Sequence, residues 1–240
     1  MLNVYLGNYA ELGGSWKGWE RLSQRLLDVA ERNGNVEVER RARVVLAGLE
    51  MRRANADEAA ELLAPAVDDA SRRGDGSTLG RLLAMLGVAY REAGRPREAR
   101  RRLQDAARAH RSVRNHRGYA TVLIHLADID NDLGQYRHAV RRAATVLRIE
   151  RRMASPDPVL RMSAYEALGD GRYGLDAAAE AIESYEQAVA LAAQHVSQPI
   201  WQRIVPRLAS AYETTGQSER ATELRRTHHQ DADQPSRSSR

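Results

Sequence analysis

The 240-residue chain contains no cysteine and no phenylalanine, and its 37 basic residues include a single lysine, Lys17. The absence of cysteine excludes disulfide bonds and thiolate metal sites. No apolar run reaches the roughly 18 residues of a membrane span, and the N-terminal segment lacks the basic and apolar regions of a signal peptide. We therefore expect a cytoplasmic protein whose packing depends on aliphatic side chains and tyrosine.

Leucines recur at nearly constant spacing along the whole chain. The gaps between successive members are 40, 40, 40, 42 and 40 residues. A fixed period of this size is typical of a solenoid, in which helical hairpins stack in a row and each contacts its neighbours. The sequence therefore predicts six units with these leucines as reference points: Leu6, Leu46, Leu86, Leu126, Leu168 and Leu208.

The third unit shows the repeated pattern most clearly. Apolar residues lie at helical 3/4 spacing on both sides of Gly94 and Pro96, which suit the end of one helix and the first turn of the next. We expect Gly87 to face Ala99 where two antiparallel helices cross, because only small side chains allow a close approach. The residues that carry the pattern are Leu86, Gly87, Tyr90, Ala99, Leu103 and Ala106.

This pattern resembles the tetratricopeptide repeat (TPR), which has Leu-Gly-x-x-Tyr on one helix and Ala-x-x-x-aromatic-x-x-Ala on the next. The resemblance covers residues 1–229 and implies an all-α fold, a right-handed α-solenoid of about six TPR-like helical hairpins. The period of about 40 exceeds the usual TPR period of about 34, which we attribute to helices of about 16–18 residues. The expected units are residues 1–34, 35–74, 75–115, 116–156, 157–197 and 198–229, followed by a disordered polar tail at 230–240.

A narrower resemblance concerns the N-terminal unit and one joint. The run Tyr5-Leu6…Gly14-Ser15-Trp16…Trp19 and the joint Arg73-Gly74-Asp75 are similar to the C-terminal TPR regions of actinobacterial regulators of the NB-ARC and SARP types. This resemblance implies the sensor or docking part of a regulator. Because Met1 begins inside the first expected helix, we expect apolar, uncapped ends, which favour truncation from a longer protein or self-association end to end.

Two short motifs imitate ligand sites. The segment 169–174 has G-x-G-x-x-G spacing, but it lies within helical periodicity instead of following a strand. The triplet that begins at Asp128 starts like a calcium loop, but Leu133 and Ala139 replace the glycine and glutamate that such a loop needs. No histidine pair has metal-binding spacing. We therefore expect no catalytic residue, no metal site, no cofactor and no enzymatic activity.

In TPR folds the first helix of each hairpin lines a concave groove. By resemblance, partner-facing residues lie two and five positions before and after each reference leucine. These positions are basic in the second and third units and carry carboxylates and amides in the fourth and fifth, which predicts a peptide of mixed charge as the partner; the alternative is a solvated polar surface. The groove residues include Arg41, Met51, Arg81, Arg91, Asp128, Asn131, Glu166, Asp170 and Tyr173.

The second helices of units three and four carry a repeated set of arginines. Residues 95–152 contain 15 arginines and six acidic residues, a net charge of +9, whereas the rest of the chain has a net charge of −4. Three equivalent positions in unit two hold Asp57, Glu61 and Asp68. The basic outer face is compatible with solvation, with a protein contact, including the acidic face of a neighbouring molecule, and with nucleic-acid phosphates. Its members are Arg97, Arg101, Arg102, Arg108 and Arg111, and Arg137, Arg141, Arg142, Arg148 and Arg151.

The sequence thus favours a non-catalytic scaffold or sensor that binds a peptide or protein segment within a bacterial transcriptional or signalling regulator. The alternative is an accessory nucleic-acid-binding module that uses the arginines of residues 95–152. Because aromatic residues do not interleave these arginines, sequence-specific nucleic-acid binding is not expected.

Overall fold

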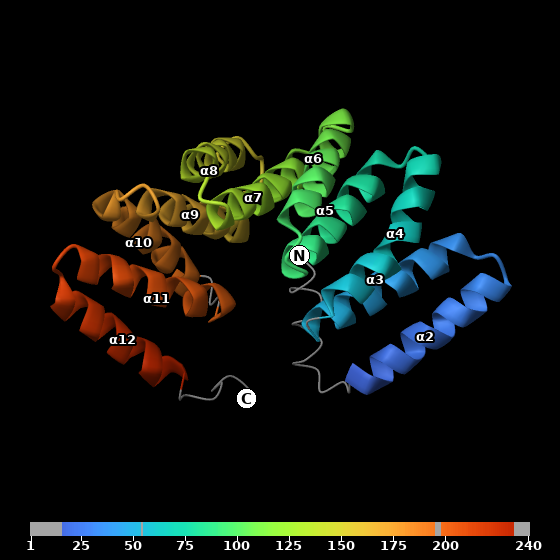
Figure 1. Ribbon diagram of the computed structural model, residues 1–240, viewed down its shortest axis with the longest axis horizontal. Helices are drawn as coiled ribbons and strands as arrows, with labels where there is room; N and C mark the ends of the chain where they lie inside the picture. Colours follow the sequence, from blue (N-terminus) through green and yellow to red (C-terminus); the bar gives the residue numbers. More distant parts are fainter. Residues whose placement is uncertain (1–15, 54, 195–197, 233–240) are drawn as a thin grey trace. The chain divides into compact units, whose positions relative to one another are not determined.

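A computed structural model of the chain describes residues 16–53, 55–194 and 198–232 (Figure 1). Over these residues the regular secondary structure is entirely α-helical, which confirms the predicted all-α class. The chain divides between Gly118 and Tyr119 into two compact parts, each of which contains several of the expected repeats. These two parts are called the first unit and the second unit, and each is described by itself. Residues 1–15, which include the first helix expected for unit one, lie outside the described residues, as do residues 233–240.

The described residues of the first unit form five helices of 17 residues each, which lie before α7 (His116–Asp132). They are α2 (Trp16–Arg32), α3 (Val36–Arg52), α4 (Ala56–Arg72), α5 (Gly76–Glu92) and α6 (Pro96–Ser112). Each helix packs against the next along the chain, from α2 on α3 to α5 on α6. The helices therefore form a stack of antiparallel hairpins in which α4 and α6 are the second helices of consecutive repeats.

The second unit continues the same alternation. It contains α7 (His116–Asp132), which begins three residues before the division, α8 (Tyr136–Glu150), α9 (Pro158–Tyr173), α10 (Ala178–Gln194), α11 (Gln198–Thr214) and α12 (Ser218–Ala232). Contacts between α9 and α11 join the first helices of consecutive hairpins. Because α12 extends to Ala232, residues 230–232 of the expected tail are helical.

Seven of the described turns between helices contain a residue with left-handed backbone geometry. Glycine occupies this place at positions 34, 74, 94, 134 and 216, with φ between 64° and 75°. Arg114 and Asp176 occupy the same place with φ of 52° and 60°. For a residue with a Cβ atom this conformation costs roughly 1–2 kcal/mol, so these two turns are locally strained.

Side chains at the other end of several turns cap the next helix. The carboxylates of Asp75 and Asp157 accept hydrogen bonds from the backbone N–H groups of Thr78 and Leu160, at 3.0 and 3.1 Å. The Asn35 side chain accepts from Val38 N–H at 3.2 Å. Such caps satisfy backbone donors that have no partner inside the helix, and so they fix where each helix begins.

Small residues allow the helices to approach closely. A Cβ atom added at Gly87 would lie 2.6 Å from Leu103 Cγ and 3.3 Å from the backbone oxygen of Ala99, as expected from the repeat pattern. Gly169 lies inside α9, and a Cβ atom there would lie 2.4 Å from the Tyr185 ring. The G-x-G-x-x-G motif therefore belongs to helix packing.

The helices at the two ends of the described chain differ in their exposed residues. On α2, Leu22, Leu26 and Val29 are 43–52% exposed. On α12, by contrast, the exposed residues at 218–220, 222, 223, 225 and 226 are polar. Self-association through the ends remains a prediction. None of the described helices combines the length and the apolar character needed to cross a bilayer.

Candidate binding face of the second unit

The residues expected to line the groove of the second unit lie on its first helices. Asp128 and Asn131 belong to α7, and Glu166, Asp170 and Tyr173 belong to α9. The structure adds α11, which places Arg203 and Arg207 against α9. We call the following side chains of α7, α9 and α11 the first-helix face: Asp128, Asn131, Glu166, Asp170, Tyr173, Arg203, Arg207, Ser210 and Thr214.

Glu166 organises the centre of this face. Its side chain is 9% exposed, and its two oxygens accept hydrogen bonds from Arg203 Nε at 2.9 Å and Arg203 Nη2 at 2.5 Å. Arg207 Nη1 donates to the same carboxylate at 2.7 Å. The geometry of the Arg203–Glu166 pair is bidentate, which makes it both directional and stronger than a single neutral hydrogen bond.

Asp170 continues the cluster one turn further along α9. It accepts a hydrogen bond from the Tyr185 hydroxyl at 2.7 Å and one from Arg207 Nη1 at 3.0 Å. Burial raises the pKa of the Asp170 carboxyl, while the Arg207 charge opposes this rise. Glu166 and Asp170 are therefore occupied by partners inside the protein, and they position the arginines of α11.

The remaining predicted residues also make contacts within the unit. Asn131 Nδ2 donates to the backbone oxygen of Ala167 at 3.1 Å, which links α7 to α9. The Tyr173 hydroxyl lies 3.0 Å from Thr214 Oγ1 and 3.3 Å from Ser210 Oγ. The Asp128 side chain is 27% exposed. The hydrogen bonds with Glu166 raise the pKa of the Arg203 guanidinium, and the charge of Asp128 adds to this rise.

The free hydrogen-bond donors of the face come from Arg203 and Arg207. Their side chains are 50% and 42% exposed. After the contacts with Glu166 and Asp170, Arg203 Nη1 and the Nε and Nη2 atoms of Arg207 have no hydrogen-bond partner among the described residues. Neither arginine is among the groove residues predicted from the sequence, although Arg203 lies five residues before Leu208, the reference leucine of the sixth repeat, where the position rule applies.

The predicted groove residues of the first unit form no comparable cluster with one another. Arg81 is exposed on α5, and Arg91 is half-buried near the end of the same helix. Arg41 pairs with Glu37 on its own helix at 2.7 Å. Met51 is half-buried near the end of α3.

A buried histidine, which the sequence pattern does not reveal, lies in the first unit. The His110 ring is 4% exposed and fits between Gly80 and Gly118, where added Cβ atoms would lie 2.8 and 2.6 Å from it. Its Nδ1 atom is buried and has no hydrogen-bond partner among the described residues. Burial, and secondarily the charge of Arg81, lowers the pKa of His110.

The arginines of the basic outer face lie on α6 and α8, in different units. Arg97, Arg101 and Arg108 on α6 are exposed, as are the arginines at 137, 141 and 148 on α8. Arg142 differs from them, because its Nε atom donates at 2.7 Å to Asp130, which is 1% exposed. Arg142 therefore anchors α8 to α7 and contributes little to the outer surface.

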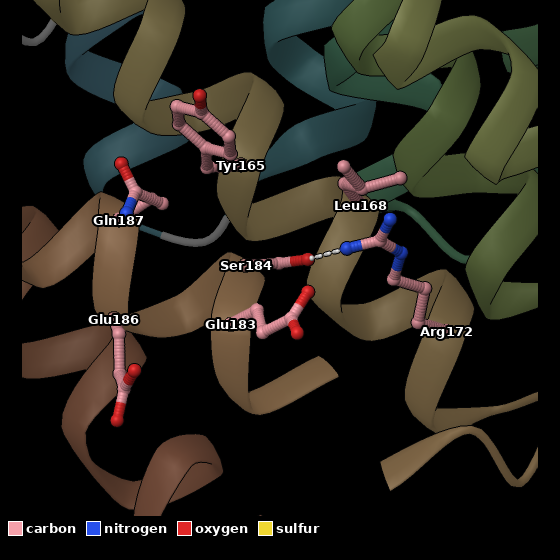
Figure 2. A pocket seen from close by; sticks show the side chains of 7 residues that line it. All are labelled: Tyr165, Leu168, Arg172, Glu183, Ser184, Glu186 and Gln187. Carbon is pink, nitrogen blue, oxygen red and sulfur yellow. Dashed lines mark hydrogen bonds between the residues drawn. The ribbon is translucent and has the colours of Figure 1, made fainter. Parts of the chain in front are cut away.

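An open hollow of about 330 Å³ lies between α9 and α10 (Figure 2). Within it Arg172 Nη1 donates to Ser184 Oγ at 2.7 Å, which closes one wall. The hollow mixes apolar and charged groups, and no cluster of three or more metal-ligating side chains occurs in the part of the chain that the structure describes. The lining residues are Tyr165, Leu168, Arg172, Glu183, Ser184, Glu186 and Gln187.

Comparison with solved structures shows that the fold is TPR-like. A putative kinesin light chain of Podosopora anserina with nearly identical TPR-like repeats matches with a TM-score of 0.63 and 24% identity, over 81% of this chain and 97% of that one. BtubC (BKLC) of P. vanneervenii matches with a TM-score of 0.73 and 20% identity, over 95% and 97%. NprR, solved with its cognate peptide NprX, matches with a TM-score of 0.65 and 17% identity, over 87% and 60%. The sequence matches no protein-family model and no curated protein.

Proposed function

We propose that the chain is a non-catalytic module that binds a peptide or protein segment on the first-helix face of its second unit. The observation that carries this proposal is the pair Arg203 and Arg207. Buried Glu166 holds both guanidinium groups in place, and each keeps N–H donors without a partner among the described residues at a half-exposed position. Donors fixed in advance lose little conformational freedom on binding, so they favour association.

The chemistry of the face selects hydrogen-bond acceptors as ligands. Because Glu166 and Asp170 already accept hydrogen bonds from the protein, the outward-facing groups of this cluster are guanidinium donors. A peptide offers matching acceptors in its backbone carbonyl groups and in aspartate or glutamate side chains. Tyr173, with Ser210 and Thr214, extends the polar surface along the same helices.

Two further observations support this proposal. Solenoid repeats present extended surfaces along their stacked helices, and proteins of this class use such surfaces for binding. NprR, which has the same fold, was solved with a bound peptide. We also propose, from the TPR-like fold and the sequence resemblance, that the module works within a bacterial transcriptional or signalling regulator.

A displayed library of random peptides tests the proposal. We expect the purified protein to enrich a set of peptides that carry acidic residues, and the double variant R203Q/R207Q to lose that set. The matched control is R225Q, because Arg225 is 46% exposed and pairs with Glu213 on the last two helices. Equal enrichment by the wild-type protein and the double variant would reject the assignment of the face.

A further inference from the structure

Helices α4 and α6 of the first unit carry opposite charges at equivalent positions. The two helices have the same length, and their bounds differ by 40 residues. The acidic strip on α4 consists of Asp57, Glu61 and Asp68, and the basic strip on α6 consists of Arg97, Arg101 and Arg108. All six residues are exposed, so each exposed carboxylate has a guanidinium 40 positions further along the chain.

The two strips run in the same direction on one unit. Both α4 and α6 pack against α5, which runs between them in the chain. Arg95, the N-cap residue of α6, lies with Nη1 3.3 Å from Asp57 Oδ1 at the start of α4. The two helices therefore begin at the same end of the unit.

Most of these charges have no ion-pair partner among the described residues. This applies to Glu61 and Asp68 of the acidic strip and to Arg97 and Arg101 of the basic strip. Asp57 pairs with Arg95, and Arg108 pairs with Asp105 on its own helix. Both of these pairs are largely exposed, and exposed pairs contribute little free energy, so they compete weakly with other partners.

We infer that this surface binds a second copy of the chain, with the acidic strip of each copy against the basic strip of the other. A twofold axis that runs parallel to the helices, outside the protein surface and over the line midway between α4 and α6, places α4 of one copy against α6 of its partner at the same height. Asp57 then faces position 97, Glu61 faces position 101 and Asp68 faces position 108. The same three contacts occur twice, as an isologous interface requires.

Charge selects this arrangement over the alternatives. A twofold axis perpendicular to the helices would place each strip against the same strip of the partner, so carboxylates would face carboxylates and guanidinium groups would face guanidinium groups. A nucleic acid on the basic strip would lie beside the acidic strip of α4, which repels phosphates. A second copy of the chain fits this surface because it carries the same two strips at the same spacing.

The interface is expected to be weak and sensitive to salt. All its pairs are exposed, and the Debye length falls from about 30 Å at about 0.01 M salt to about 3 Å at about 1 M. Sedimentation equilibrium of the full chain should therefore show a monomer–dimer equilibrium at low salt and monomer at high salt.

Two complementary variants test the pairing. The variant E61R/D68R has two basic strips, and the variant R101E/R108E has two acidic strips, so each alone should be monomeric at low salt. An equimolar mixture should form a heterodimer, because both contacts regain opposite charges. The control E183R alters an exposed residue of α10 in the second unit and should dimerise as the wild-type chain does.

Three results would overturn the inference. The first is a wild-type chain that stays monomeric at low salt, and the second is a dimer that persists in both charge-reversal variants. The third is a mixture of the two variants that contains only monomers. If the wild-type chain is monomeric but retards a DNA duplex at low salt, and R101E/R108E does not, the basic strip binds a polyanion instead.

Discussion

Replacing Glu166 by glutamine tests the contact on which the first-helix face depends. The wild-type carboxylate accepts three hydrogen bonds from Arg203 and Arg207 and is itself buried. A glutamine of the same shape keeps one acceptor oxygen, removes the charge and turns an N–H₂ group toward Arg203. The variant therefore loses at least one charge-assisted bond and leaves two guanidinium groups without a counter-charge at this position.

The structure bounds the cost of this change. Breaking a fully buried ion pair costs roughly 3–5 kcal/mol, but both arginines are about half exposed, so water compensates them in part. We expect the free energy of unfolding to fall by about 1–2 kcal/mol, because one hydrogen bond to a charged group contributes about 1.5–3 kcal/mol and the exposure of the arginines reduces this loss. The assay is urea denaturation followed by far-UV circular dichroism.

A double-mutant cycle with R203Q separates this contact from other effects of the substitution. If the pair interacts as described, the two changes together should cost less than the sum of the single changes, by about 1 kcal/mol. A coupling near zero, or a loss in E166Q below about 0.5 kcal/mol, would show that the carboxylate does not hold the arginines.

Three further predictions concern packing, backbone strain and pH. Gly169→Ala should cost about 1–3 kcal/mol, because the new Cβ atom would lie 2.4 Å from the Tyr185 ring; Gly18→Ala is the control in urea denaturation, since no atom lies within 4 Å of its Cβ position. Arg114→Gly should raise the free energy of unfolding by about 1 kcal/mol, because φ at this residue is 52°; a drop in thermal midpoint would contradict the assignment of strain. Burial lowers the pKa of His110 below its ordinary 6.5, so the unfolded chain binds this proton more readily and stability should fall as pH decreases through 6.5. The variant His110→Gln should have a flatter profile of unfolding free energy over that range, and an unchanged slope would refute the attribution.

The helical architecture was predictable because it repeats in the sequence. The 40-residue spacing of the leucines and the Gly94–Pro96 break predict the hairpins, and the structure confirms helices on both sides of that break. Gly87 was predicted to face Ala99 for the same reason, and it does so. These features follow from a local pattern. Because the pattern recurs in each repeat, every repeat supports the helix assignment in the others.

The contacts of the candidate face were only partly predictable. The register placed Glu166 and Asp170 on the first helix of their hairpin, α9, but their arginine partners are 37 or more residues away on α11. The register gives positions along a helix and does not show which charges meet across two helices. His110 was missed because its surroundings, Gly80 and Gly118, come from two other helices. Arg114 was missed because glycine usually marks a left-handed turn.

Isothermal titration with an acidic peptide enriched by the library measures the central claim most directly. If Arg203 and Arg207 bind the peptide from positions fixed by Glu166, the double variant R203Q/R207Q should bind at least about tenfold more weakly, which corresponds to about 1.4 kcal/mol. The variant E166Q should also lose affinity, because its arginines are no longer held. Equal affinities of the wild-type chain and R203Q/R207Q would contradict the account.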